Sequence, residues 1–583
     1  MDFDEILVFL GDFGPYQRRL FLINSAILFT VPLITFGQVF MSADVAFACQ
    51  TNMHYGDQQN GTSFETVATS QSECYFFEYG QDDRPIGAKS FMNSSHMHLY
   101  INETLPRNSS GAVHRQCSSW TYDLTQYKST TVTEWDLVCD RKWLRELAQS
   151  AVYAGMVIGC IVFGSISDRY GRWMSISSCL LLQSVFCFIS AVSPYLAMYI
   201  VCQFAIGCTY PGVFLAPFAY VLEWTGHSKR SAVGNLLALM YVCGHMTFAL
   251  LAYFIRHWRI LQVAIALPQV ALLVVYMFRV VPESPRWLLT QGHVQEADVI
   301  IRKAVRMNRA TLPNSYFVFT RTFSNNLEKR SCARKEENWS MARRAEKHSL
   351  ADLFKTTKLR NVTLIICVNA FAVTMCYFGL SIFSTSLAGD AYVNFFLSGV
   401  VEVPSILVCV YIINRWGRTR PIAIFNIVSG VSCFICPFPP ADWQYLSTAF
   451  GMIGKLGAAA AFWSIYIYEA ELFPTVVSNM AIGLSILIAR VSTSVIPFTR
   501  LLADIWPPFP YVIIGTLTAI SGTFFLIAPE TLNRPLPATV EDFEEMHGNG
   551  KRSAVTGKGC TDVISRKLEY SLKELDVDVE CYL

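Results

Sequence analysis

Charge is scarce in this sequence, since only 15% of its 583 residues are Asp, Glu, Lys or Arg. The formal net charge of +2 gives no indication of a nucleic-acid partner or a strongly acidic one. The sequence lacks a G-x-x-x-x-G-K-[ST] phosphate loop and an H-E-x-x-H zinc motif, and its histidines are scattered. It begins with the acidic stretch "MDFDEILVFL", so we expect no cleavable signal peptide. We therefore expect no enzyme activity, no metal site and no cofactor.

Long apolar runs dominate instead, and 52% of the residues are hydrophobic. A bilayer core of about 30 Å requires roughly 20 apolar residues per helix. Twelve runs have about this length, so the sequence predicts an all-α membrane protein with twelve transmembrane helices. The predicted spans are 20–41, 145–167, 174–192, 196–222, 232–254, 260–281, 362–383, 392–413, 421–438, 444–468, 479–501 and 510–528.

Basic residues gather on one side of these spans, for example at Arg18, Arg169 and Arg415. The positive-inside rule makes this side the cytoplasm, so both termini are predicted to be cytoplasmic. The predicted segments are a cytoplasmic N-terminus (1–19), the first transmembrane helix (20–41), an extracellular loop (42–144), the rest of an N-terminal six-helix bundle (145–281), a cytoplasmic linker with amphipathic helices (282–361), a C-terminal six-helix bundle (362–528) and a cytoplasmic tail (529–583).

The 42–144 loop has the residues of an extracellular segment. It holds four of the 18 cysteines, which allow three disulfide pairings that the sequence leaves open. Asn-x-Ser/Thr acceptors in the same loop predict glycosylation. The cysteines are Cys49, Cys74, Cys117 and Cys139, and the acceptors are Asn60, Asn93, Asn102 and Asn108.

The two halves of the chain repeat the same motifs at the cytoplasmic ends of the spans. "GSISDRYGR" (164–172) matches "INRWGRTR", "YVLEW" matches "YEAEL", and "PES" matches "PET". Each pair is separated by about 247 residues, as expected for a duplicated six-helix unit. Two parallel six-helix repeats resemble the layout of the major facilitator superfamily, in which the binding site lies at the membrane midplane between the halves.

The repeated motifs contain acidic and basic residues that are predicted to form charge-assisted hydrogen bonds. Gly164 is expected to allow a close helix approach, and Gly171 a tight turn. We predict that these clusters lock the two halves together when the protein is closed to the cytoplasm. The alternative is that they only fix the orientation in the membrane. The predicted gating residues are Asp168, Arg169, Arg172, Glu223, Arg415, Arg418, Glu469 and Glu471.

Arg490 lies near the centre of the eleventh predicted span. An arginine at that depth costs roughly 2.5–3.5 kcal/mol on insertion scales, so it should face a watery cavity or a partner. Ser485, Ser492 and Thr493 are predicted to extend a polar stripe beside it. We predict that Arg490 binds substrate or a coupling ion, and the alternative is a structural ion pair with Glu402.

Two further charged residues and a set of aromatic residues complete the predicted binding site. Lys455 is predicted either to line a cavity or to extend toward the outer surface. Glu402 precedes Pro404, and a kink there would expose the carboxylate to a pore, whereas pairing inside the bundle is the alternative. The aromatic side chains could surround an ammonium group, although packing is their commoner role. They are Tyr377, Phe378, Tyr210, Tyr241, Trp463 and Tyr466.

The sequence resembles the organic ion transporters of the major facilitator superfamily, and within them the organic cation/carnitine transporters. The resemblance rests on stretches such as "STTVTEWDLVCDRKWL" (129–144) and "GKLGAAAAFWSIYIYEAELFPTVVSNM" (454–480), and it extends over nearly the whole chain. Members similar to the carnitine and organic-anion branches carry arginine at the place of Arg490, which implies contact with an anionic group of the substrate. Lys455 matches a basic residue that is common in the family, which implies a second positive element.

Two departures from the family pattern concern coupling and gating. The first span lacks the asparagine that similar carnitine transporters carry near its middle, which weakens the case for sodium coupling, so the coupling ion, sodium or proton, stays open. Glu469 stands where the family has a neutral residue.

We therefore predict a secondary-active transporter that works by alternating access on carnitine-like zwitterions or organic anions, as a symporter. The alternatives are a polyspecific organic cation transporter and a transport-inactive receptor or scaffold. We expect a glycosylated, multi-pass protein of the plasma membrane that functions as a monomer. Its expected partners are a small organic ion and the lipid bilayer, with no nucleic acid.

Overall fold

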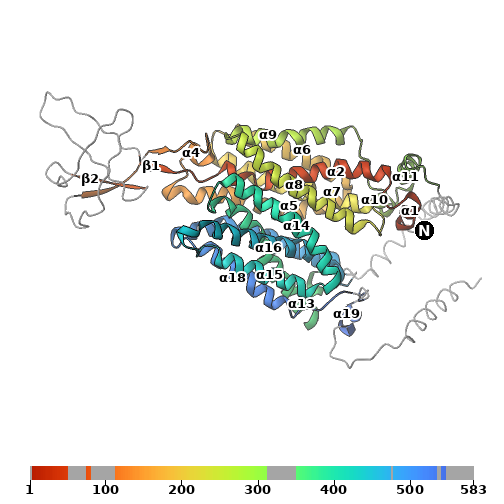
Figure 1. The fold of residues 1–583 in the computed structure, drawn as a ribbon. Helices are drawn as coiled ribbons and strands as arrows, with labels where there is room; N and C mark the ends of the chain where they lie inside the picture. Colours follow the sequence, from red (N-terminus) through yellow and green to blue (C-terminus); the bar gives the residue numbers. More distant parts are fainter. Residues whose placement is uncertain are drawn as a thin grey trace, which may run out of the picture.

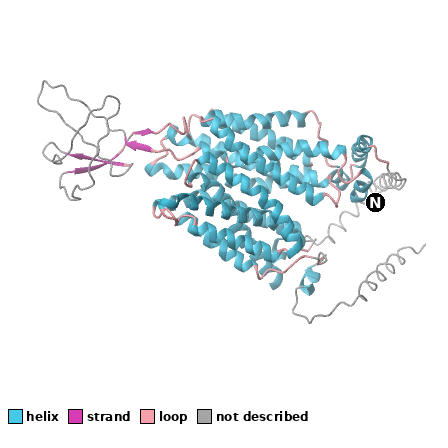
Figure 2. Cartoon of the chain, viewed as in Figure 1, coloured by secondary structure: helices cyan, strands magenta, loops and turns pink. Residues whose placement is uncertain are grey.

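The long helices lie roughly parallel in one bundle, and a few short strands lie beyond one end of it (Figures 1 and 2). This computed structural model describes residues 3–49, 74–79, 112–117, 119–311, 350–474, 477–532 and 540–546, together with Arg534 and Pro537. We call the end of the bundle nearest the strands the strand end. The opposite end, where α1 (Phe3–Leu10) lies, is called the cluster end.

The first half of the bundle contains six long helices, the first of which is interrupted at Phe36 and resumes in a short helix. Its elements are α2 (Pro15–Thr35), α3 (Gly37–Met41), α5 (Lys142–Tyr170), α6 (Arg172–Ala191), α7 (Leu196–Glu223), α8 (Arg230–Phe254) and α9 (Trp258–Met277).

The second half repeats this arrangement. Its elements are α13 (Thr357–Phe383), α14 (Ala391–Trp416), α15 (Thr419–Ile435), α16 (Gln444–Leu472), α17 (Ser478–Thr499) and α18 (Phe509–Phe525). Within the described residues, ten helical segments are long and apolar enough to cross a membrane, and α15 and α18 are shorter apolar helices. The predicted all-α fold with twelve spans is confirmed.

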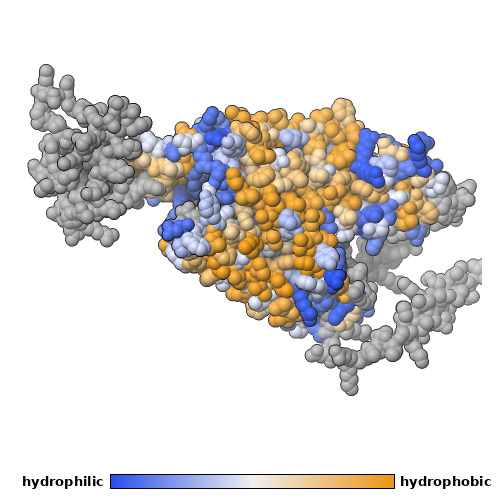
Figure 3. All heavy atoms as spheres, in the orientation of Figure 1, coloured by the Kyte–Doolittle hydropathy of each residue, from blue (hydrophilic) through white to orange (hydrophobic). Residues whose placement is uncertain are grey.

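The outer surface of the bundle carries a broad hydrophobic zone between its two ends. Figure 3 shows this zone in orange, with hydrophilic residues in blue at the strand end and the cluster end. A bilayer core excludes polar surface in the same way, and the helices satisfy their own backbone hydrogen bonds inside it. The distribution of hydrophobic surface therefore fits a protein embedded in a membrane.

Two small antiparallel sheets lie at the strand end. β1 (Phe47–Cys49) pairs with β4 (Trp120–Tyr122), and β2 (Tyr75–Tyr79) pairs with β3 (Ala112–Gln116). Of the three possible disulfide pairings, the structure contains Cys49–Cys117 and Cys74–Cys139. The short helix α4 (Thr131–Trp135) follows the sheets and begins with a capping box at Thr130. The four predicted glycosylation sites lie outside the described residues.

The cluster end is covered by short helices, α10 (Pro285–Gln291), α11 (Val294–Asn308) and α19 (Val540–Met546). The apolar residues Val294, Ala297 and Ile301 of α11 are spaced along one helical face, and this face is buried. Asn308 at its end accepts a hydrogen bond from the backbone N–H of Tyr16 at 2.8 Å. The amphipathic helix is therefore attached to the start of the first span.

The two halves meet along α5 and α17 and along α8 and α14. Polar contacts between them include Lys142 with Asp504 at 2.5 Å and the hydroxyl of Ser150 with the carbonyl of Ser494 at 2.9 Å. His245 of α8 also contacts Ser398 of α14 at 3.1 Å. These contacts all lie in the part of the bundle nearer the strand end.

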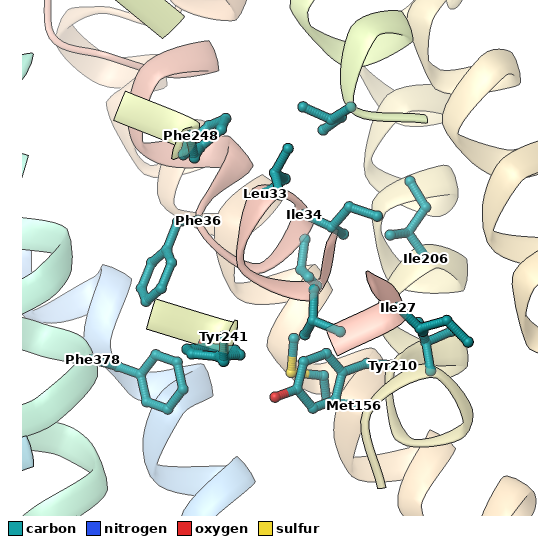
Figure 4. Packing of buried hydrophobic residues seen from close by; sticks show 14 of the residues in the cluster. Ile27, Leu33, Ile34, Phe36, Met156, Ile206, Tyr210, Tyr241, Phe248 and Phe378 are labelled. Atoms are coloured by element: carbon teal, nitrogen blue, oxygen red, sulfur yellow. The ribbon is translucent and has the colours of Figure 1, made fainter. Parts of the chain in front are cut away.

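Close packing inside the first half occurs between α5 and α7. A Cβ atom on Gly155 or Gly159 would lie only 2.1 Å from the backbone of α7, whereas a Cβ on Gly164 would meet nothing within 4 Å. The expected close helix approach at Gly164 is therefore wrong, and the close approach occurs nearer the middle of α5. Figure 4 shows part of the buried apolar cluster in which the halves meet, including Tyr210 and Phe378.

Candidate functional site

Arg490 is buried in the interior of the protein and lacks partners for two of its nitrogens. It lies near the middle of α17, and only 2% of its surface is exposed. Its guanidinium carbon is 5.0 Å from the ring centre of Tyr210 on α7, in the opposite half. Nε and Nη1 of Arg490 have no hydrogen-bond partner among the described residues. Two nitrogens of a permanently charged group, which carry three N–H donors between them, are therefore unpaired close to where the halves meet.

The predicted polar stripe beside Arg490 is wrong. The hydroxyl of Ser485 donates to Glu469, that of Ser492 to the carbonyl of Phe371, and that of Thr493 to the carbonyl of Ala489. These hydroxyls satisfy other acceptors. Residues five positions before and two and three positions after Arg490 point in different directions around a helix.

Glu402 forms a compact buried cluster with a lysine and two aromatic residues. Its carboxylate is 3.4 Å from Nζ of Lys455, and it accepts hydrogen bonds from the hydroxyl of Tyr377 at 2.5 Å and from Nε1 of Trp463 at 3.2 Å. Nζ of Lys455 also donates to the hydroxyl of Ser381 at 2.8 Å and lies 3.3 Å from the ring centre of Tyr377. The two charges are thus neutralised within the second half.

This cluster decides between alternatives that the sequence left open. Glu402 pairs with Lys455, so the alternative in which Arg490 pairs with Glu402 is wrong in this conformation. Lys455 is 1% exposed, so it does not extend to the outer surface. Glu402 is fully buried, which favours pairing inside the bundle over exposure at a kink near Pro404.

The predicted aromatic residues include side chains that contact the Glu402–Lys455 pair and one that contacts Arg490. Tyr377 stacks on Phe462 with ring centres 4.5 Å apart, and Phe462 meets both Trp463 and Tyr466 edge-on at 5.5 Å. Tyr241 of α8 lies edge-on to Trp463 at 6.3 Å. The two remaining predicted residues extend the set, since Phe378 lies 5.1 Å from Tyr377 and Tyr210 lies against Arg490.

At the cluster end, Arg172 of the first half lies at the centre of a network of hydrogen bonds. Its Nη1 donates to Asp168 at 2.8 Å, and its Nε and Nη2 both lie near Oε1 of Glu223 at 3.2 and 3.1 Å. The backbone N–H groups of Arg172 and Trp173, at the start of α6, donate to the carboxylate of Glu283. Burial raises the pKa of Glu283 above its usual value, although the three backbone donors, at Ser284, Trp173 and Arg172, oppose this.

Arg418 has the same place in the second half. Its Nε and Nη2 donate to the two oxygens of Glu471 at 3.1 and 3.0 Å, and its Nη1 donates to Asn414 at 2.8 Å. The backbone N–H groups of Arg418 and Thr419 donate to Glu530. Burial opposes ionisation of Glu530, but backbone N–H donors outweigh it and lower the pKa of this carboxyl.

The partners of each arginine lie in its own half in this conformation. The lock between halves was predicted for the conformation closed to the cytoplasm, so it stays a prediction. All contacts described for Arg172 and Arg418 join helix ends within one six-helix unit. The remaining predicted gating residues are separated. Arg169 and Arg415 are exposed, whereas Glu469 is fully buried and receives a hydrogen bond from Ser485.

Sequence reasoning missed three residues in these sites. Glu283 and Glu530 lie in the repeated "PES" and "PET" motifs, and this repetition was the available signal for their shared role. Phe462 directly precedes Trp463, but nothing in the sequence distinguishes a ring that stacks on Tyr377 from one that packs against lipid.

Comparison with known proteins gives consistent results. A family model described as "Sugar (and other) transporter" matches residues 99–543. The "Organic cation transporter protein" of Drosophila melanogaster is 35% identical over 97% of this chain and 99% of its own length. The human "Organic cation/carnitine transporter 2" is 31% identical over 94% of this chain and 95% of its own length. The inward open structure of the E. coli xylose transporter XylE aligns with a TM-score of 0.52 over 70% of this chain and 90% of its own; at 16% identity this likeness shows the fold alone.

Proposed function

The chain belongs to the organic ion transporter family of the major facilitator superfamily, and we propose that it carries small organic carboxylates, in particular carnitine-like zwitterions and organic anions. Transport across a membrane, and not catalysis, is the activity of this family. The human relative is named for cations and carnitine, and the Drosophila relative for cations, so the choice of carboxylates depends on this chain's own buried charges.

The observation that carries the proposal is the pair of unpartnered nitrogens of Arg490. A guanidinium in the bilayer interior is costly unless a partner compensates it, and a carboxylate accepts two parallel N–H bonds from it. Lys455 and Glu402 neutralise each other, so Arg490 adds one uncompensated positive charge to this group of residues. A site with this charge favours a substrate that carries an anionic group.

The aromatic residues support a zwitterion whose other end is an ammonium group. The rings of Tyr241, Trp463 and Tyr466 form a connected set through Phe462. Aromatic faces attract ammonium groups, most strongly where water is excluded. A substrate with a carboxylate at Arg490 would place a quaternary ammonium several ångströms away, among these rings.

We further propose an orientation with the strand end outside and both termini in the cytoplasm of a plasma-membrane protein that works as a monomer. Paired cysteines at the strand end and basic residues at the cluster end support this orientation. The contacts of Lys142 and Ser150 with the second half then hold the outer end closed. Alternating access requires these contacts to break when the protein opens outward.

Uptake into proteoliposomes at equal pH on both sides tests the charge assignment. Wild type is expected to exchange labelled carnitine and an aromatic carboxylate. It should exchange tetraethylammonium only poorly. Arg490→Gln should lower carboxylate exchange by about 10- to 100-fold, since a hydrogen bond to a charged group is worth roughly 1.5–3 kcal/mol. Arg360→Gln removes an exposed arginine at the start of α13 and should behave as wild type.

Charge reversal sharpens the same experiment. Arg490→Asp should abolish carboxylate exchange and favour tetraethylammonium. Carboxylate exchange that survives this reversal would contradict the proposal. Wild type that exchanges tetraethylammonium best would make the protein a polyspecific organic cation transporter, and no exchange of any probe by folded protein would favour a receptor or scaffold.

A further inference from the structure

Glu469 is a fully buried carboxylate with almost no partners. It lies near the cluster end of α16, and its exposure is 0%. One oxygen accepts a hydrogen bond from the hydroxyl of Ser485 on α17 at 2.5 Å. The other oxygen has no hydrogen-bond partner, and no ion pair reaches Glu469 within the part of the chain that the structure describes.

The charged and titratable groups around Glu469 do not compensate a negative charge. Cys367 of α13 and Tyr466 of α16 lie within electrostatic range of it, and neither is a cation. The buried charged groups of the neighbouring helices have other contacts, and Arg360, Arg415 and Arg420 on these helices are exposed. Glu402 of α14 is paired with Lys455, Arg418 before α15 is paired with Glu471, and Arg490 of α17 faces Tyr210.

An ionised carboxylate in this environment is strongly disfavoured. Removing a charge from water is costly, and only a counter-ion or several hydrogen bonds can repay that cost. One hydroxyl donor is not sufficient. The neutral acid, by contrast, carries one proton on its second oxygen and has no charge that needs a counter-ion. Glu469 therefore carries a proton in this conformation.

We propose that Glu469 is a proton-binding site that couples substrate transport to the movement of one proton. Glu469 is deprotonated when it contacts water and must take up a proton before it can be buried as it is here. The proton binds to a carboxylate oxygen from water on one side of the membrane and returns to water on the other side. The site thus makes the change between conformations depend on proton uptake.

The position of Glu469 relative to Arg490 fits such coupling. Ser485, its donor, precedes Arg490 by five residues on α17, which corresponds to about 7.5 Å along the helix axis. Tyr466 lies within electrostatic range of both Glu469 and Arg490. The proposed proton site is therefore separate from the substrate charge site but close enough to respond to the same movement of α16 against α17.

A proton gradient across proteoliposomes tests the coupling. With the membrane potential clamped at zero, an inward gradient of about one pH unit supports up to about tenfold accumulation of labelled carnitine if one proton moves with each substrate molecule. Wild type should show this accumulation and lose it when a protonophore is added. Glu469→Gln should lose the accumulation but keep exchange of labelled carnitine at equal pH within about twofold of wild type.

Two further variants serve as controls. Glu469→Asp keeps a titratable carboxyl and should retain gradient-driven accumulation. Glu541→Gln removes an exposed carboxylate on α19 and should match wild type in both assays. Thermal unfolding of each purified variant reports whether it is folded.

The outcomes separate this proposal from the assignment of Arg490 on which its choice of substrate rests. Accumulation by Glu469→Gln equal to that of wild type would overturn the proton site, and so would wild-type transport that ignores the gradient. Loss of exchange as well as accumulation in folded Glu469→Gln would also overturn it, since Glu469 would then be structural. A failure of the Arg490 assignment appears instead in the exchange assay at equal pH.

Discussion

The cluster ends of the two halves contain the same network, and three of its four positions hold the same residue type in both halves. In each half a glutamate after the sixth long helix (α9 or α18) accepts hydrogen bonds from the first backbone N–H groups of the third (α6 or α15). An arginine at the start of that third helix pairs with a glutamate at the end of the fourth (α7 or α16). A helix N-terminus favours a carboxylate because its N–H groups are unsatisfied and its dipole is positive there. The equivalent residues are Asp168, Arg172, Glu223 and Glu283 in the first half, and Asn414, Arg418, Glu471 and Glu530 in the second.

The geometry differs where the arginine meets its glutamate. Arg418 contacts both oxygens of Glu471, and the hydroxyl of Thr531 donates to the same carboxylate at 2.9 Å. Arg172 contacts only Oε1 of Glu223, whose Oε2 has no hydrogen-bond partner among the described residues. The duplicated motif thus keeps the arginine and both glutamates in equivalent places. Asp168 of the first half is replaced by the neutral Asn414 in the second, and only Arg418 contacts both oxygens of its glutamate.

The largest predicted effect on stability concerns a feature that the two halves share, the glycine that precedes α6 in the first half and the one that comes shortly before α15 in the second. Gly171 and Gly417 have φ values of +98° and +97°, and a Cβ would lie 2.2 Å from Glu283 and 2.5 Å from Glu530. Gly171→Ala and Gly417→Ala should each lose about 1–3 kcal/mol from backbone strain alone. Both variants should therefore show a clearly lower unfolding temperature in detergent.

Gly164→Ala is the matched control, because a Cβ there meets nothing within 4 Å. It should unfold at or slightly above the wild-type temperature, since alanine favours a helix interior over glycine. If Gly171→Ala were as stable as Gly164→Ala, the shared role of the two glycines would be disproved. A large effect at only one of Gly171 and Gly417 would show that the networks are not equivalent.

The second prediction uses the difference between the two arginines. Lysine cannot make two parallel hydrogen bonds to a carboxylate, so Arg418→Lys breaks the contact with both oxygens of Glu471, whereas Arg172 makes no such contact with Glu223. A difference of about 1.4 kcal/mol would correspond to a tenfold difference in rate. We expect initial carnitine uptake to fall about tenfold more in Arg418→Lys than in Arg172→Lys. Arg420→Lys, an exposed neighbour, should match wild type, and equal losses at Arg172 and Arg418 would contradict the distinction.

The sequence was sufficient to predict the elements of these networks but not their connections. The repeated motifs predicted that Glu223 and Glu471 are partners of the arginines, because the same residue types recur at one spacing in both halves. They did not predict that each network stays within its own half. That depends on how far apart the two bundles lie at the cluster end, which is a property of the tertiary packing.

The interior of the membrane was harder to predict for a related reason. Apolar runs are sufficient to locate twelve spans, but helix rotation decides which buried charges meet. Arg490 was the partner named for Glu402 in the structural alternative, but it is Lys455 that faces Glu402. Ser485 was assigned to the Arg490 side of α17, yet its hydroxyl points to Glu469. Spacing along one helix cannot determine the orientation of the next.

The smallest predicted effect distinguishes the two capping carboxylates by pH. The pKa of Glu530 is lowered, so its contribution to stability is present above its unfolded pKa and is lost as the pH falls. The pKa of Glu283 is raised, so its contribution is present at low pH and is lost as the pH rises through the folded value. Glu530→Gln should therefore be more destabilising near neutral pH than near the ordinary pKa of a glutamate, and Glu283→Gln should show the opposite trend.

We expect changes in unfolding temperature of about 2 °C, in line with a free-energy effect of about 1 kcal/mol or less. Melting curves of both variants and wild type across this pH range test the trend, and parallel pH profiles for the two variants would show that the duplicated carboxylates are electrostatically the same.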